Sequence, residues 1–179
     1  ANLPASGPGW FVHRLAFAPR LDGEDDEWRS SGAEPVAFGG ATPWLRASVG
    51  RANERVHLLV QVADTSRQRG EAHWPGDLEF DRVRLRLLGP GGELVLRLAN
   101  TDSGELLVAG EDGLPPPIRV EGFWREHEGG YTLELALPQA FDVRGLGIEA
   151  RDLDAAGQRR LAGTADDGTV LRAWPLHGY

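Results

Sequence analysis

Acidic side chains are concentrated in one short stretch of the chain. Five carboxylates lie among the six residues from Asp22 to Glu27. Calcium takes roughly six to eight hard oxygen ligands, which Asp and Glu commonly supply. Asp22 and Asp25 are therefore candidate calcium ligands, although their spacing is not that of an EF-hand. Asp25 and Asp26 would equally suit the first turn of a helix, where the helix dipole favours negative charge.

A second acidic pair, Asp152 and Asp154, lies later in the sequence, shortly before a glycine. It is also a candidate calcium loop, and its simpler interpretation is a strand that ends in a turn. With so many carboxylates, a small hydrolase that uses two opposed acids stays open as an alternative. The motifs of serine hydrolases, P-loop NTPases and zinc proteases are absent, and the five His residues are scattered. His57 lies on the less apolar face of an expected strand and is predicted to be an ordinary surface residue. Calcium is thus the one cofactor that the residues suggest, and no catalytic residue is predicted.

Tryptophan is the second residue type that points to binding chemistry. The chain has six Trp but two Tyr, and a Trp ring can stack on the apolar face of a sugar or anchor a core. Trp74 lies in a loop with Gly and Pro and is expected to be the most exposed of these rings. Core packing is the alternative role for Trp74, Trp44 and Trp124, whereas Trp28 is assigned to the core. The predicted ligand site has two residues of the Trp74 loop, a second Trp nearby and a hydrogen-bonding carboxylate: His73, Trp74, Trp124, and Asp64 or Asp77.

The residue types that are missing exclude several kinds of chemistry. The chain has no Cys and therefore no disulfide, zinc finger or iron–sulfur cluster. It has no Lys, which removes Schiff-base and P-loop lysines, so all 19 basic residues are Arg. The net charge of −8 disfavours binding to nucleic acid or to an anionic membrane. Arg82, Arg84 and Arg86 are a local exception, and their alternation with Leu and Val is typical of the solvated face of a half-buried strand.

The elements that must position these residues are strands. Apolar and polar residues alternate along most of the chain, turn signals with Gly and Pro recur at short intervals, and helical periodicity is poor. Short helical turns are expected near residues 25–30 or 138–141. The pattern predicts an all-β fold, an antiparallel β-sandwich of jelly-roll type with short helical turns only. The expected strands are 45–49, 56–62, 82–88, 93–99, 106–109, 118–124, 131–137, 145–152 and 171–174.

The length favours a single domain. In a chain of 179 residues, about 70% of the surface of the open chain can be buried, which suffices for one core. Residues 1–9 are expected to be a flexible lead-in, and residues 10–179 to form one β-sandwich domain. No apolar run approaches the roughly 18 residues of a transmembrane helix.

Two groups of motifs resemble a known family. An opening DG…DEW, from Leu21 to Trp28, is followed by a strand that ends at Asp64, and a GYxLExxxP strand runs from Gly130 to Pro138. Over residues 15–163 this pattern resembles the family 9 carbohydrate-binding modules, β-sandwiches found beside xylanases and in many extracellular proteins. The resemblance implies their fold and a saccharide ligand. Arg84 stands where many sugar-binding members carry Glu, and the calcium ligands of the family do not map onto matching positions.

A second resemblance rests on residues 11–15 (FVHRL) with 19–23 (PRLDG), and on residues 120–125 (VEGFWR) leading into Gly130 and Tyr131. Together they resemble the extracytoplasmic sensor region of proteobacterial membrane histidine kinases dedicated to sortase systems. That region lies between transmembrane helices and precedes the cytoplasmic kinase core. The resemblance implies a periplasmic location and a membrane-anchored parent protein. No kinase motif lies in this chain, which is expected to have no phosphotransfer activity of its own.

The first functional hypothesis is therefore a non-catalytic sensor domain of a two-component histidine kinase that binds a cell-envelope saccharide or another extracytoplasmic ligand. The alternative is a carbohydrate-binding accessory module of a secreted glycoside hydrolase. The small hydrolase and a structural adhesion domain stay open behind these two. We expect no nucleic-acid partner, and an acidic surface with open sandwich edges favours a monomer or a weak dimer.

Overall fold

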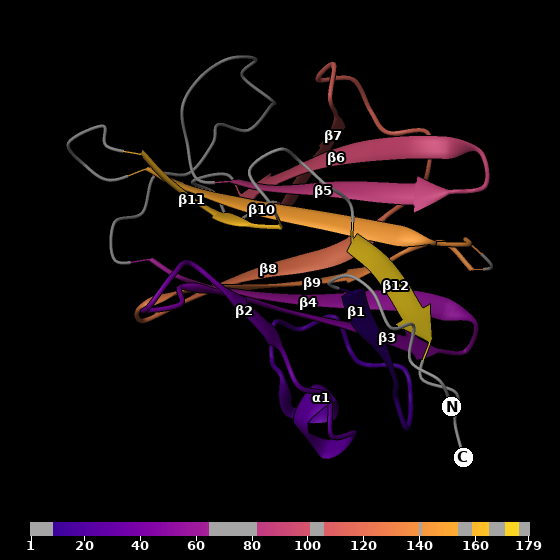
Figure 1. Cartoon of the computed structure of the whole chain (residues 1–179), viewed down its shortest axis with the longest axis horizontal. Coiled ribbons are helices and arrows are strands. Elements are labelled where there is room, and N and C mark those ends of the chain that lie inside the picture. Colours follow the sequence, from indigo (N-terminus) through magenta and orange to yellow (C-terminus); the bar gives the residue numbers. More distant parts are fainter. Residues whose placement is uncertain are drawn as a thin grey trace.

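The structure, a computed structural model, describes residues 9–64, 82–100, 106–139, 141–153, 159–164 and 171–175. Its strands form two layers that lie face to face (Figure 1), which confirms the predicted all-β sandwich. The one helix in the described part of the chain is the five-residue α1 (Asp26–Ser30), close to the expected helical turn. Among the described residues, no helix has the length and apolar character needed to span a bilayer.

The lower layer in Figure 1 contains the strands β1 (Gly9–Arg14), β2 (Val36–Phe38), β3 (Leu45–Ala52), β4 (Arg55–Ala63), β8 (Glu121–His127) and β9 (Gly130–Ala136). Their order from one edge is β8-β9-β4-β3, with antiparallel neighbours throughout. β2 and β1 then share the remaining edge of β3.

The upper layer contains β5 (Arg82–Gly89), β6 (Gly92–Asn100), β7 (Leu106–Gly110), β10 (Gly145–Leu153), β11 (Arg159–Gly163) and β12 (Leu171–Pro175). The order is β7-β6-β5-β10, again antiparallel. β11 and β12 share the remaining edge of β10.

The first and last strands join the two layers. β12 pairs with β10 and also, in parallel, with β1, which pairs in parallel with β3. Hydrogen bonding thus continues from one layer into the other, and the predicted antiparallel arrangement is wrong for these two pairings. β1, β2 and β11 were not expected, because they are short and lack clear alternation. β1 begins at Gly9, the last residue of the predicted lead-in, and the rest of that segment lies outside the described residues.

Alternate side chains of the strands fill the space between the layers. On β5, Val83, Leu85 and Leu87 are at most 1% exposed, whereas the arginines between them are half-buried. The same cluster includes buried residues of β9 and β10. The two faces of β5 therefore have the different environments that the alternation predicts.

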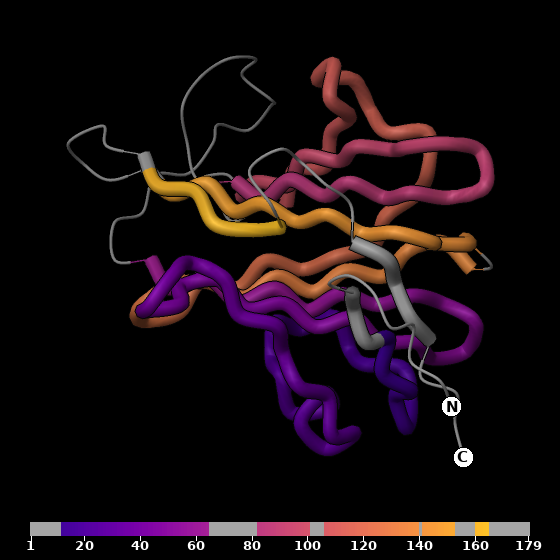
Figure 2. Tube along the Cα trace, viewed as in Figure 1, coloured from indigo at the N-terminus to yellow at the C-terminus, as the bar shows by residue number. Residues whose placement is uncertain are grey.

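A second apolar cluster lies on the outer face of the lower layer. The chain between Leu15 and Ala33, which we call the covering segment, crosses this face as the indigo and violet trace below the layer in Figure 2. Leu15 and Trp28 pack there with Ala52 and Leu59. Because this segment covers the outer face, every residue of β9 is buried. Trp28 is 1% exposed, so its predicted place in a core is confirmed.

His57 on β4 was expected to be an ordinary surface residue, and the structure contradicts this. The side chain is 3% exposed, and neither ring nitrogen has a hydrogen-bond partner among the described residues. Burial, reinforced by the charge of Arg55 and opposed by Glu121, lowers the pKa of His57 from 6.5 to about 4. The error arose because the covering segment lies far from β4 in sequence.

The buried imidazole predicts a pH-dependent loss of stability. Between about pH 4 and 6.5 the unfolded chain binds a proton at His57 that the folded chain does not, so stability falls as the pH drops through this range. The full loss is about 3 kcal/mol. We expect His57→Leu to remove this component, as measured by urea unfolding of both proteins at pH 7 and pH 4.5. Identical pH dependence in the two proteins would contradict the assignment.

Candidate functional site

The two family-like motifs meet in one buried contact. Oε1 of Glu134, in the GYxLE strand, accepts a hydrogen bond from the backbone N–H of Gly23 at 2.9 Å. Its Oε2 accepts one from Nε1 of Trp28, in the DG…DEW segment, at 3.4 Å. Glu134 is fully buried, and this burial, with the charges of Asp22 and Glu27, raises its pKa to about 8 despite the two donors. The two hydrogen bonds of this carboxyl join the segment that covers the outer face to β9.

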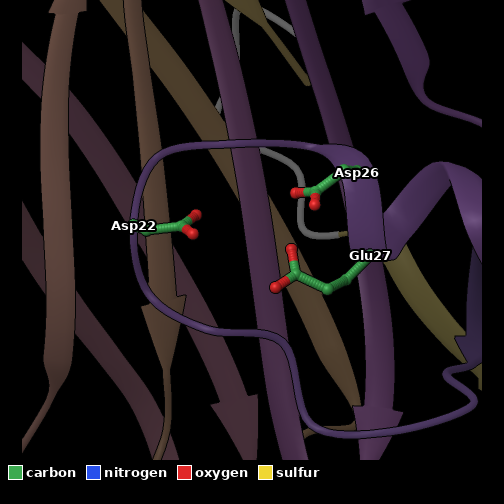
Figure 3. Close-up of side chains that lie close together, drawn as sticks. All are labelled: Asp22, Asp26 and Glu27. Carbon is green, nitrogen blue, oxygen red and sulfur yellow. The ribbon is translucent and has the colours of Figure 1, made fainter.

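Three carboxylates converge beside this contact. Figure 3 shows Asp22 on the loop and Asp26 and Glu27 on α1 with their side chains directed into one space, and their ligand oxygens lie within 4.8 Å of one another. Glu27 is 6% exposed, and its Oε1 accepts hydrogen bonds from Arg20. Its Oε2 is buried without a partner among the described residues. This donor set fits a hard cation such as calcium, for which carboxylate oxygens are the preferred ligands.

The predicted calcium ligands are only partly brought together. Asp22 belongs to this trio, but Asp25 does not, because its carboxylate accepts hydrogen bonds from Arg29 and Gln61. Asp152 lies in a different part of the molecule, and Asp154 is outside the described residues. The acidic stretch was identified from sequence, but which of its side chains converge depends on how α1 folds against the loop.

We expect calcium to stabilise the protein through the Asp22, Asp26 and Glu27 trio. Calcium at about 100 times its dissociation constant would add about 2.7 kcal/mol, which corresponds to roughly 5–11 °C in melting temperature for a chain of this size. Glu27→Gln should abolish the shift and Asp25→Asn should preserve it. The measurement is thermal unfolding with calcium and with chelator, and equal melting temperatures for the unsubstituted protein would contradict the prediction.

A polar cluster lies where β3 begins and β4 and β10 end. Asp152, on β10, forms an ion pair with Arg160 of β11. The guanidinium of Arg160 also donates to the carbonyl of Ala63 at 2.7 Å and lies 4.1 Å from the ring centroid of Trp44. Burial raises the pKa of Asp152, and the neighbouring Asp64 raises it further against the opposing effect of Arg160. These contacts tie the two layers together at this end and account for the burial of Trp44 and Asp64.

The structure describes two residues of the predicted ligand site, Trp124 and Asp64, and both are buried. Trp124 is 4% exposed and stacks on Tyr131 at a centroid distance of 4.0 Å, so it has the core role that was its alternative. It lies within β8 and not at its end. Asp64 is 7% exposed and lies in the polar cluster at the end of β4. The remaining predicted residues, His73, Trp74 and Asp77, lie outside the described residues.

The ends of the segment that carries Trp74 are nevertheless defined. The chain leaves the lower layer after Asp64 and enters the upper layer at Arg82, the first residue of β5. Arg82 is directly opposite Arg151, near the end of β10. Asp64 and Arg82, the described residues on either side of residues 65–81, therefore lie at the end of the sandwich where the polar cluster is found.

Arginines line the outer face of the upper layer at this end. Arg82, Arg84 and Arg86 alternate on β5, with Arg151 of β10 opposite Arg82 and Arg97 of β6 opposite Arg84. Arg84 is paired with Glu111, and Arg86 with Glu93. All five arginines are half-buried. The alternation of Arg82, Arg84 and Arg86 predicted the outer face of a half-buried strand, and the structure confirms this placement.

A comparison with solved structures finds a protein of similar fold. A family 9 carbohydrate-binding module from Caldicellulosiruptor kristjanssonii, in complex with glucose, matches with a TM-score of 0.60 over 94% of this chain and 98% of that chain. The sequences are 14% identical. No family model matches the sequence, and a search of curated proteins finds no match. The chain therefore has a β-sandwich fold like that of the family 9 carbohydrate-binding modules.

Proposed function

We propose that this chain is a non-catalytic domain that binds a saccharide. The likeness to a family 9 carbohydrate-binding module over almost the whole of both chains carries the proposal. The polar outer face of the upper layer supports it, because half-buried arginines and Glu149 offer donors and acceptors for sugar hydroxyls. Trp74, in the connection that enters β5, would supply the stacking ring, with His73 and Asp77 beside it.

The sensor domain of an extracytoplasmic, membrane-anchored histidine kinase is the specific role that we propose. The sequence resemblance at residues 11–15 and 120–131 supports it. Saccharide binding would then bias the conformation that is passed through the membrane.

The alternative role is an accessory module of a secreted glycoside hydrolase. The name of the structural neighbour favours it. The two roles share the saccharide site and differ in the domains that flank it. The gene sequence on either side of this chain separates them, since one role requires membrane helices and a kinase and the other a catalytic domain.

A saccharide panel tests the binding function. We expect at least one soluble saccharide or cell-wall fragment at about 100 times its dissociation constant to raise the melting temperature by roughly 5–11 °C. Trp74→Ala should abolish the shift and leave the unliganded protein as stable as before. Phe123→Ala, which removes an aromatic side chain that is 44% exposed on β8, is the matched control and should bind normally. A large loss of stability in Trp74→Ala would instead make Trp74 a packing residue.

A further inference from the structure

A groove lies where β1 and β3 end, beside the C-terminal end of α1. Its volume is about 780 Å³, which falls in the range of roughly 300–1,000 Å³ that small-molecule sites occupy. The described residues that line it are 12–16, 30–31 and 51–53. None of these ten residues is Asp or Glu, whereas two are arginines. The lining is therefore basic in a chain whose net charge is −8.

Strand register places the two arginines of the groove side by side. Arg14 of β1 is opposite Arg51 of β3 in the parallel pairing of these strands. Two residues earlier, Val12 and Val49 are opposite each other in the same way, and both are buried in the core. Residues two apart on a strand lie on one face, and neighbouring strands are about 4.7–4.9 Å apart. The two arginine side chains thus start from adjacent positions on one face of the sheet, near the point where both strands end.

Both arginines are exposed and available to a ligand. Within the part of the chain that the structure describes, neither side chain makes a hydrogen bond or an ion pair, in contrast to Arg55, which is paired with Glu121. Glu54 follows the groove residues in the turn after β3, but it neither lines the groove nor pairs with either arginine. The segments that precede β1 and follow β12, residues 1–8 and 176–179, contain no Asp or Glu.

Two further polar groups line the same groove. The hydroxyl of Ser31 accepts a hydrogen bond from the backbone N–H of Ala16 at 3.1 Å, which leaves its own proton available to donate. The same bond ties the end of α1 to the residues that follow β1. Asn53, in the turn between β3 and β4, brings a side-chain amide with two N–H donors. Hydrogen-bond donors therefore surround the space beside the two arginines.

We infer that this groove binds a small organic anion, whose carboxylate or phosphate group is held jointly by Arg14 and Arg51. The planar guanidinium fork matches two oxygens of either group, which favours arginine for their recognition. Ser31 and Asn53 would donate hydrogen bonds to other oxygens of the ligand. A long nucleic acid fits less well, because the acidic remainder of the chain repels a polyanion. The inference does not depend on the proposed saccharide function.

Calorimetric titration at low salt tests the inference with inorganic phosphate, glucose 6-phosphate, glucuronate and, as the neutral probe, glucose. We expect at least one of the three anions to bind, with an affinity that falls as salt is added. Which anion binds more tightly identifies the recognised group as phosphate or carboxylate. Arg14→Gln and Arg51→Gln should each reduce that affinity at least tenfold, since each removes a charged hydrogen-bond donor. Arg51→Lys, which keeps the charge but loses the fork, should lie between.

Arg46→Gln is the matched control, because Arg46 is also exposed and lies on β3, near the end of the strand that is remote from the groove. It removes the same charge and should leave every affinity unchanged, and unfolding curves should show that each variant is folded. An equal loss of anion affinity in Arg46→Gln would indicate a general effect of net charge and overturn the site. Absence of anion binding, or anion binding that survives in both Arg14→Gln and Arg51→Gln, would overturn it as well.

Discussion

Replacing Trp28 by Ala is expected to lower the free energy of unfolding by about 3–5 kcal/mol, the cost of truncating a large buried aromatic. Trp28 is 1% exposed and anchors α1 and the loop before it to the outer face of the lower layer. The substitution also removes the Nε1 hydrogen bond to Glu134. A fully buried carboxyl would then keep only the Gly23 donor, which adds to the loss.

Urea unfolding measures this effect, with two companion variants. Trp28→Phe keeps most of the apolar packing but loses the Nε1 donor, and should cost about 1–3 kcal/mol, the penalty for a buried acceptor left unpaired. Phe123→Ala serves again as the exposed control and should change stability by about 0.5 kcal/mol at most. If Trp28→Ala lowered the free energy of unfolding by less than about 1 kcal/mol, Trp28 would not be the residue that holds the covering segment against the lower layer.

Gly130→Ala is expected to have the second large effect, about 3 kcal/mol or more. Gly130 has φ of +154°, and a Cβ at this position would lie 1.9 Å from the carbonyl oxygen of Val62. That oxygen belongs to β4, so the pairing of β4 with β9 must shift to admit a methyl group. The close approach gives a physical reason for the glycine of the GYxLE motif.

The neighbouring glycine provides the control. Gly129 has φ of +85°, but a Cβ added to it would meet no atom of the described residues within 4 Å, its two chain neighbours aside. Gly129→Ala should therefore show only the cost of a left-handed backbone, about 1–2 kcal/mol. Equal losses of stability in the two variants, measured by chemical unfolding, would contradict the role of the close approach.

The alternation of apolar and polar residues predicted the strands of both layers well, because alternate residues of a strand face the core and the solvent. Leu133 and Leu135 on β9, and Val83 and Leu85 on β5, are buried as their alternation indicates. The strands that were missed have little such pattern, as in the three residues of β2. Their place in the sandwich comes from pairing with β3 and β10, whose own sequences carry the alternation.

Contacts made by the covering segment could not be predicted in the same way. Glu134 alternates away from the main core as expected, yet it is fully buried because Trp28 and Gly23 reach it from more than a hundred residues away in sequence. His57 was misjudged for the same reason. Trp124 has the sequence context of a residue next to a charged turn, and only the stacking on Tyr131 places it in the core.

The candidate sites show the same division. The acidic stretch from Asp22 to Glu27 was visible in the sequence. That Asp26 and Glu27, and not Asp25, converge with Asp22 depends on the geometry of α1. The arginine alternation on β5 was visible as well. Its meeting with Arg97 and Arg151 depends on strand register, which no single strand encodes.

The most direct test of the central claim is a glycan microarray that carries neutral and acidic bacterial cell-envelope saccharides, probed with the folded chain. We predict binding to at least one saccharide, competition by the same saccharide in solution, and loss of binding in Trp74→Ala with an unchanged unfolding curve. A folded chain that binds no saccharide on the array would contradict the saccharide-binding function.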